Sequence, residues 1–187
     1  MSLDHLWAAW RSDYVAGVSS QPPPLLDAAA SRRAAGGPGE EAECVFCRIF
    51  SSGEPDEVHH IVWQGPLSVV LLNAFPYSSG HLLVMPRRHV AELEDLEQEE
   101  SSDVWEAVRT SVRAVQAAYS PDGCNIGANL GRAAGAGIPR HFHLHVVPRW
   151  VGDTNFMTTV ASTRVLPEAL PDSWSKLRAA WPGGRPA

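Results

Sequence analysis

Histidine alternates with apolar residues in the segment His141-Phe142-His143-Leu144-His145-Val146-Val147. Successive side chains of a β-strand point to opposite faces, so this alternation predicts a strand with all three imidazoles on one face. The apolar side chains then pack on the core from the other face. Consecutive histidines of such a strand lie about 6.6 Å apart. The segment therefore predicts a row of three imidazoles along one strand.

Two other interpretations of this row remain open. One is a half-exposed strand whose polar face carries histidine without a function. The chain holds only eight histidines, so three of them within five positions argue against this interpretation. The other is a three-histidine metal site in a metal-dependent hydrolase, because imidazole is a common ligand of catalytic metals.

The rest of the chain supplies the partners of this strand. Residues 93–118 repeat apolar side chains at helical spacing, which predicts one main helix that Pro121-Asp122-Gly123 ends. Runs of β-branched and apolar residues between turn signals predict the strands. The five predicted strands are Val58 to Trp63, Leu67 to Leu72, Gly80 to Pro86, Cys124 to Asn129 and Phe142 to Pro148. Strands gathered around one long helix indicate an α+β fold on a mostly antiparallel sheet of about five strands.

The predicted domain organisation has four parts. Residues 1–16 form a helical arm, because apolar side chains from Leu3 to Tyr14 recur every three or four positions. Residues 17–43 are rich in proline and glycine, which predicts a flexible linker loop. The main domain spans residues 44–166, and residues 167–187 form a C-terminal helix and tail.

Composition limits the classes of function. The formal charge of −6 argues against a nucleic-acid partner, because such proteins need a basic face that neutralises phosphates. No apolar stretch approaches the roughly 20 residues that span a bilayer, so no membrane association is expected. Three cysteines and no signal-peptide pattern predict a reduced, cytoplasmic protein.

The histidine row resembles the signature of the histidine-triad (HIT) family. The similarity is greatest to its bacterial branch of diadenosine polyphosphate hydrolases and phosphorylases, and it covers most of residues 6–170. Only residues 17–43 look specific to this chain. The other matching segments are Leu6 to Tyr14, Cys44 to Ile49, Gly80 to His89, Pro148 to Trp150 and Gly152 to Phe156. The resemblance implies a HIT-like fold and a homodimer.

This resemblance implies a catalytic role for two histidines. His143, the middle one, would attack the α-phosphorus and carry the nucleotide as a phosphoramidate until water, phosphate or another acceptor removes it. A neutral imidazole is nucleophilic near pH 7. A backbone carbonyl across the sheet is the expected acceptor for the other ring nitrogen. His145 would stabilise charge or donate a proton at the departing oxygen, unless it is only an exposed strand residue.

The resemblance also implies a set of substrate-binding residues. Asn73 matches the amide that contacts the ribose, and His81 completes the Gly-His turn after it. A glycine-rich loop lets backbone amides approach phosphate. The substrate-binding candidates are Asn73, His81, Asn125, Asn129, Gly135, Gly137 and Arg140. Each amide could instead stabilise a turn, and Arg140 departs from the acidic or neutral residue expected before the triad, which leaves substrate detail open.

Cys44-Val45-Phe46-Cys47 has the spacing of two thiolate ligands of one zinc ion. The resemblance implies that His89 and His141 complete a structural Cys₂His₂ site. A redox pair remains an alternative, although no thioredoxin-like unit is visible. His59 and His60 compete as ligands.

The sequence thus predicts a HIT-family nucleotidyl hydrolase or transferase that cleaves dinucleoside polyphosphates through a covalent intermediate on His143. Alternatives are a phosphoramidate or acyl-adenylate hydrolase of the same family, or a nucleotide sensor with slow turnover. No organic cofactor is expected beside the structural zinc, and Mg²⁺ is allowed as a companion of the nucleotide.

Overall fold

The computed structural model describes residues 44–153 and 168–183 of the chain. Apart from residues 151–153, they belong to one compact unit. The arm predicted over residues 1–16 and the linker predicted over residues 17–43 lie outside the described residues, as does the segment 154–167.

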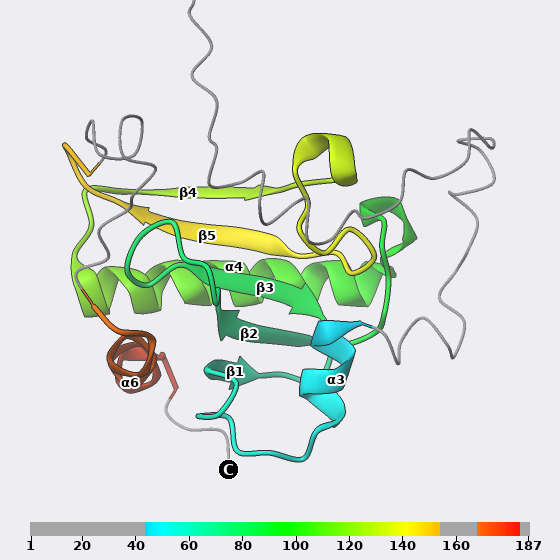
Figure 1. The fold of residues 1–187 in the computed structure, drawn as a ribbon, viewed down its shortest axis with the longest axis horizontal. Helices are drawn as coiled ribbons and strands as arrows, with labels where there is room; N and C mark the ends of the chain where they lie inside the picture. The colour runs from blue at the N-terminus through cyan, green and yellow to red at the C-terminus, as the bar shows by residue number, and fades with distance from the viewer. Residues whose placement is uncertain (1–43, 154–167, 184–187) are drawn as a thin grey trace, which may run out of the picture. The chain divides into compact units, whose positions relative to one another are not determined.

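Five strands form one antiparallel sheet with the order β1-β2-β3-β5-β4. Figure 1 shows this sheet with the helices around it, which confirms the predicted α+β fold. The strands are β1 (Ile61–Gln64), β2 (Ser68–Leu72), β3 (Leu82–Pro86), β4 (Gly123–Ala128) and β5 (Leu144–Arg149). Their order places the strand with the histidines between β3 and β4.

Apolar side chains cover both faces of the sheet. In β2, Val70 and Leu72 join the larger core beneath the helix α4 (Gln98–Tyr119). The alternate residues Val69 and Leu71 join a smaller core on the opposite face, together with Phe46 of the helix α3 (Val45–Ser51). Burial on both faces explains why this strand is a continuous apolar run instead of an alternating one.

The main helix α4 begins with a capping box. The Glu97 side chain accepts the backbone N–H three residues on, and the Glu100 side chain accepts the Glu97 backbone N–H. The helix therefore begins five residues after the predicted start, and the 3₁₀ turn η1 (Leu93–Asp95) occupies part of the difference. It ends at Tyr119, and its C-cap Ser120 lies in the left-handed region with φ 45°. No helix among the described residues is both long and apolar enough to cross a bilayer.

The C-terminal helix α6 (Leu170–Ala180) covers the β1 edge of the sheet. The Trp174 indole N–H donates to the Ile61 carbonyl at 2.8 Å, and the Arg178 guanidinium donates to the Val62 carbonyl at 3.1 Å. These side chains satisfy carbonyls that an edge strand would otherwise present to other chains.

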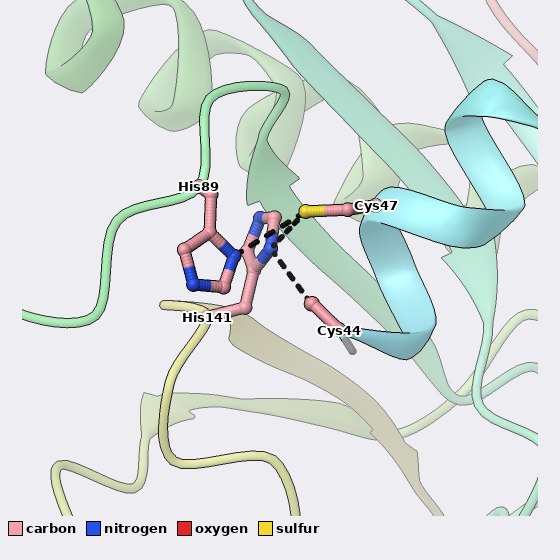
Figure 2. A group of neighbouring side chains, drawn as sticks. All are labelled: Cys44, Cys47, His89 and His141. Carbon is pink, nitrogen blue, oxygen red and sulfur yellow. Dashed lines mark hydrogen bonds between the residues drawn. The ribbon is translucent and has the colours of Figure 1, made fainter. Parts of the chain in front are cut away.

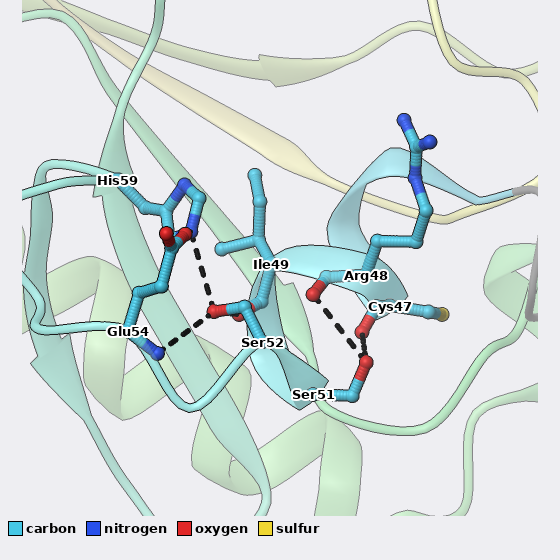
Figure 3. Close-up of polar contacts among 7 residues, drawn as sticks. All are labelled: Cys47, Arg48, Ile49, Ser51, Ser52, Glu54 and His59. Carbon is cyan, nitrogen blue, oxygen red and sulfur yellow. Dashed lines mark hydrogen bonds and ion pairs between the residues drawn. The ribbon is translucent and has the colours of Figure 1, made fainter.

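Helix α3 is short and was not predicted. Hydroxyl groups satisfy the carbonyls of its last turn, because Ser51 donates to Cys47 and Arg48, and Ser52 donates to Ile49 (Figure 3). Seven residues are too few for a stable isolated helix, so its position depends on the contacts of its side chains.

Candidate active site and metal centre

The imidazoles of the histidine row lie on the α3 face of the sheet. His145 pairs directly with Leu83 across β3 and β5, and Leu83 belongs to the smaller core on that face. Directly opposed residues share a face. The regular strand begins at Leu144, so His141 and His143 precede it and the observed strand starts two residues later than predicted.

His143 is buried, with 7% of its surface exposed. Its Nδ1–H donates to the carbonyl oxygen of His141 at 2.8 Å. Burial lowers the pKa of His143, and the hydrogen bond only partly offsets this effect. The ring is therefore neutral near pH 7 with its lone pair on Nε2. The acceptor lies two residues back in the same segment, not across the sheet as the sequence analysis expected.

A chain of hydrogen bonds fixes the proton on His145. The Tyr77 backbone N–H donates to Nδ1 of His81 at 3.0 Å, and the Asn73 amide contacts the same nitrogen at 3.4 Å. Nδ1 of His81 is thus an acceptor, and its proton sits on Nε2. Nε2–H of His81 then donates to Nδ1 of His145 at 2.9 Å. The proton of neutral His145 is therefore on Nε2.

His81 is fully buried behind His145, with 0% of its surface exposed. Gly80 makes this turn with φ +78°, and a Cβ there would lie 2.7 Å from the Tyr119 ring, so only glycine fits. Asn73 also accepts the Phe75 backbone N–H at 3.0 Å. The turn therefore brings Asn73 and His81 together, and the contact of His81 with the site runs through His145.

The other substrate-binding candidates lie along β4 and the loop after it. Asn129 follows Ala128, which pairs with Leu144, so Asn129 lies beside the end of β5 that His143 precedes. Its amide donates to the Gly135 carbonyl at 3.4 Å. Gly135 has φ 88° and follows the 3₁₀ turn η2 (Arg132–Ala134), which was not predicted. Gly137 is half-buried in this loop.

Asn125 and Arg140 lie apart from that loop contact. Asn125 is opposite Val147, beyond the His145 pair, and its side-chain oxygen accepts a hydrogen bond from Arg149 at 2.9 Å. Arg140 is exposed. The structure thus brings Asn129 to the end of β5 that His143 precedes, and Asn125 to a position further along the strand.

Cys44, Cys47, His89 and His141 form a second cluster, here named the Cys/His group (Figure 2). Their ligand atoms all lie within 4.8 Å of one another. The Nδ1 of His141 is 3.4 Å from the Cys44 sulfur and 3.6 Å from the Cys47 sulfur, and Nδ1 of His89 is 3.3 Å from the Cys47 sulfur. Tetrahedral zinc separates sulfur and nitrogen ligands by about 3.5 Å. The group therefore fits zinc.

The protonation of His141 agrees with a metal ligand. Its Nε2–H donates to the Pro86 carbonyl at 2.9 Å, which turns the Nδ1 lone pair toward the sulfurs. Burial lowers the pKa of His141 to about 4, against a smaller rise from the Pro86 hydrogen bond. The ring is thus neutral, the form that binds metals. Contacts of both thiols with imidazole nitrogens also favour a metal site over a redox pair.

His59 and His60 lie outside the Cys/His group. Nε2 of His59 is 2.7 Å from a Glu54 carboxylate oxygen and 3.3 Å from the Ser52 hydroxyl (Figure 3). His60 has φ 53° in the turn before β1. Neither residue competes for the metal in the part of the chain that the structure describes.

Sequence reasoning missed two contributors. The Tyr77 backbone N–H orients His81, and no side-chain pattern reports a backbone donor. The Phe46 ring contacts both His141 and His143 edge-on. Its place between two predicted metal ligands was the only signal for that contact.

Comparisons with known proteins agree with this geometry. The HIT domain family model matches residues 54–151. The AP-4-A phosphorylase of Mycobacterium tuberculosis is 35% identical over 179 residues, covering 96% of this chain and 85% of that protein. The asymmetrical bis(5'-nucleosyl)-tetraphosphatase of Schizosaccharomyces pombe is 34% identical over 93 residues, or 50% of each chain.

Solved structures show the same similarity. A zinc-bound histidine triad family protein from Mycobacterium smegmatis is 33% identical with a TM-score of 0.61, covering 75% of this chain and 94% of that one. A Hit-like protein from Bartonella henselae has a TM-score of 0.60 at 24% identity, covering 73% of this chain and 94% of that one.

Proposed function

Because the chain belongs to the HIT domain family, we propose that it cleaves dinucleoside polyphosphates of the diadenosine tetraphosphate type through a nucleotidyl intermediate on His143. Relatives named AP-4-A phosphorylase and bis(5'-nucleosyl)-tetraphosphatase support this substrate class. One observation carries the role of His143, the hydrogen bond from its Nδ1–H to the His141 carbonyl. That bond leaves the Nε2 lone pair for attack.

The reaction then has two displacements. Nε2 of His143 forms a bond to the α-phosphorus while the bond from that phosphorus to the bridging oxygen breaks, and Nε2–H of His145 stabilises or protonates the departing oxygen. An acceptor then attacks the same phosphorus and releases His143. Asn73 holds the ribose, while Asn129 and the loop with Gly135 and Gly137 hold phosphates. Asn125 and Arg140 are further candidates for phosphate contacts, and Mg²⁺ would accompany the nucleotide.

Product analysis tests this function and identifies the acceptor. Diadenosine tetraphosphate with phosphate as the acceptor gives ADP and ATP, whereas water gives AMP and ATP. The name of the mycobacterial relative favours phosphate. We expect products from wild type and none above background from His143→Ala. Binding without turnover by wild type would favour the sensor, and products from His143→Ala would contradict the role of this residue.

Zinc in the Cys/His group has a structural role. The group connects the start of α3 to His89 and to the first histidine of the row. Four protein ligands close a zinc site, so the metal would supply stability while the reaction uses His143 and His145. Chelation is then expected to act on the fold, in contrast to a metal-dependent hydrolase.

A homodimer forms through the β4 edge. Among the described residues, α6 covers the β1 edge, and β4 ends the sheet on the other side. Charged residues and proline usually protect an edge strand from pairing with another chain, and β4 carries neither. Ile126 on this strand and Trp105 on α4 are 45% and 50% exposed. A second copy of β4 would pair antiparallel with the first and cover these side chains by two-fold symmetry.

Light scattering after size exclusion tests the dimer. Wild type is expected at twice the 20.3 kDa chain mass, and Ile126→Lys at the mass of one chain, because a charge is placed in the pairing surface. Glu106→Lys on the exposed side of α4 is the matched control. A monomeric wild type, or an unchanged mass for Ile126→Lys, would refute this interface.

A further inference from the structure

One aromatic ring connects the Cys/His group to the nucleophile. Phe46 is 3% exposed. Its ring centroid lies 5.4 Å from that of His141 at an interplanar angle of 83°, and 5.5 Å from that of His143 at 66°. Both contacts are edge-on, a favoured geometry for aromatic rings. The same side chain therefore touches a candidate metal ligand and the candidate nucleophile.

The position of Phe46 depends on the Cys/His group. Phe46 stands between Cys44 and Cys47, whose sulfurs contact His141 and His89. Helix α3 has only seven residues, and the side chain of its N-cap, Cys44, makes no capping hydrogen bond. A helix of this length does not hold its own position. Its first turn is instead located by the thiol contacts and by the small apolar core.

The orientation of His143 depends in turn on Phe46. The hydrogen bond from Nδ1 to the His141 carbonyl fixes one edge of the ring, but the ring can still tilt about that bond. Phe46 and His145 limit the tilt, because the His145 ring lies 5.1 Å from His143 at 64°. Without the Phe46 ring, only one of these two neighbours, His145, would limit the tilt of the His143 ring.

We propose that Phe46 is a positioning residue, through which the metal-bound Cys/His group holds the His143 imidazole in the orientation for attack. The proposal rests on the proposed role of His143. It assigns the metal an effect on the rate of intermediate formation without any contact with substrate. A displacement of about 1 Å at a reacting atom can cost roughly 100-fold in rate, so a loss of about 10- to 100-fold is expected when the ring is removed.

The test compares Phe46→Ala, Phe46→Leu and a matched control, Phe50→Leu, in the zinc-loaded protein. Phe50 is on the same helix and contacts His141 at 6.0 Å, but no aromatic contact with His143 joins it to the nucleophile among the described residues. Zinc content is measured for every variant. The rate of intermediate formation at saturating substrate and the affinity for a non-hydrolysable analogue are measured separately.

We expect full zinc content in all three variants. Intermediate formation should slow most in Phe46→Ala and less in Phe46→Leu, which keeps apolar volume. Phe50→Leu should form the intermediate at the wild-type rate. The affinity for the analogue should change little in all three variants. A wild-type rate in Phe46→Ala, or a loss that consists entirely of weaker binding, would overturn the proposal. If Phe46→Ala does not fold, the rate of intermediate formation and the analogue affinity of Phe46→Leu test the proposal by the same criteria.

A spectroscopic comparison without substrate separates this proposal from the proposed function. The imidazole nitrogen signals of His143 are recorded with and without zinc. We expect exchange broadening when zinc is removed from wild type, and broadening in Phe46→Ala even with zinc bound. Sharp His143 signals in zinc-loaded Phe46→Ala would overturn the proposal. If wild type forms no intermediate, the proposed function fails, and these spectra still decide the role of Phe46.

Discussion

Nε2 of His81 lies 2.9 Å from Nδ1 of His145, and His81 is itself oriented by the backbone N–H of Tyr77 at 3.0 Å. A buried histidine thus sets which nitrogen of an active-site histidine carries the proton. Because His145 accepts at Nδ1, it presents N–H at Nε2. We therefore expect His81 to affect catalysis without a contact with substrate.

His81→Ala is expected to slow cleavage of diadenosine tetraphosphate by about 10- to 100-fold, less than the roughly 100- to 10 000-fold that general acid catalysis contributes, because His145 itself remains. Cleavage of a substrate with a p-nitrophenolate leaving group should slow far less in His81→Ala, because that group departs without a proton. His81→Gln, which retains an N–H donor, should recover part of the activity. Steady-state kinetics on both substrates measure the effect, and equal losses on the two would contradict the role.

Removal of the metal is expected to destabilise the protein. A ligand that binds only the folded state adds its binding free energy to the free energy of unfolding, so we expect zinc-free protein to melt about 10 °C lower. Cys47→Ser should melt like the zinc-free protein, whereas Cys124→Ser, outside the Cys/His group, should keep its zinc. Metal analysis and calorimetry test this, and equal melting temperatures with and without zinc would refute it.

The Arg88–Glu100 pair predicts a pH dependence of stability. The Arg88 guanidinium donates to both carboxylate oxygens of Glu100, at 2.8 and 2.6 Å. The hydrogen bond from Arg88 lowers the pKa of Glu100, against an opposing effect of burial. A carboxyl with a lowered pKa in the folded state stabilises the protein above its unfolded pKa. That contribution is lost as the pH falls through the folded value.

Glu100→Gln should therefore reduce the free energy of unfolding by about 1–2 kcal/mol at neutral pH, a discounted value because Arg88 is partly exposed. The difference from wild type should shrink in acid. Glu106→Gln, in an exposed pair on the same helix, should cost less than about 0.5 kcal/mol. Urea unfolding across the pH range measures the free energy of unfolding of both variants. A difference between Glu100→Gln and wild type that grows toward acid would contradict the lowered pKa of Glu100.

The sheet could be predicted from the sequence because strands follow local apolar patterns, whereas for the Cys/His group spacing gave only the two cysteines, and His89 and His141 came from the family resemblance. Alternation located the histidine strand, and Cys44 and Cys47 had the spacing of paired ligands. Helix α3 was missed because seven residues give too short a period to recognise. The start of α4 was placed too early because the Glu97–Glu100 capping box, not the apolar pattern, determines where that helix begins.

The hydrogen bonds that set the protonation of the site could not be predicted from spacing. The acceptor for His143 is the carbonyl of His141, which depends on the backbone conformation just before β5. The contact between His81 and His145 joins residues 64 positions apart. Such contacts arise only when the sheet is assembled, because β3 then places the Gly80 turn beside β5.

The central claim is that His143 carries the nucleotide, and the mass of the intact protein tests it most directly. Wild type, His143→Ala and His143→Gly are mixed briefly with diadenosine tetraphosphate and quenched without acid, because a phosphoramidate is labile in acid. The account predicts an added adenylyl group on wild type and on neither variant. An adduct that persists in the variants, or turnover by wild type with no adduct at any time, would contradict covalent catalysis by His143.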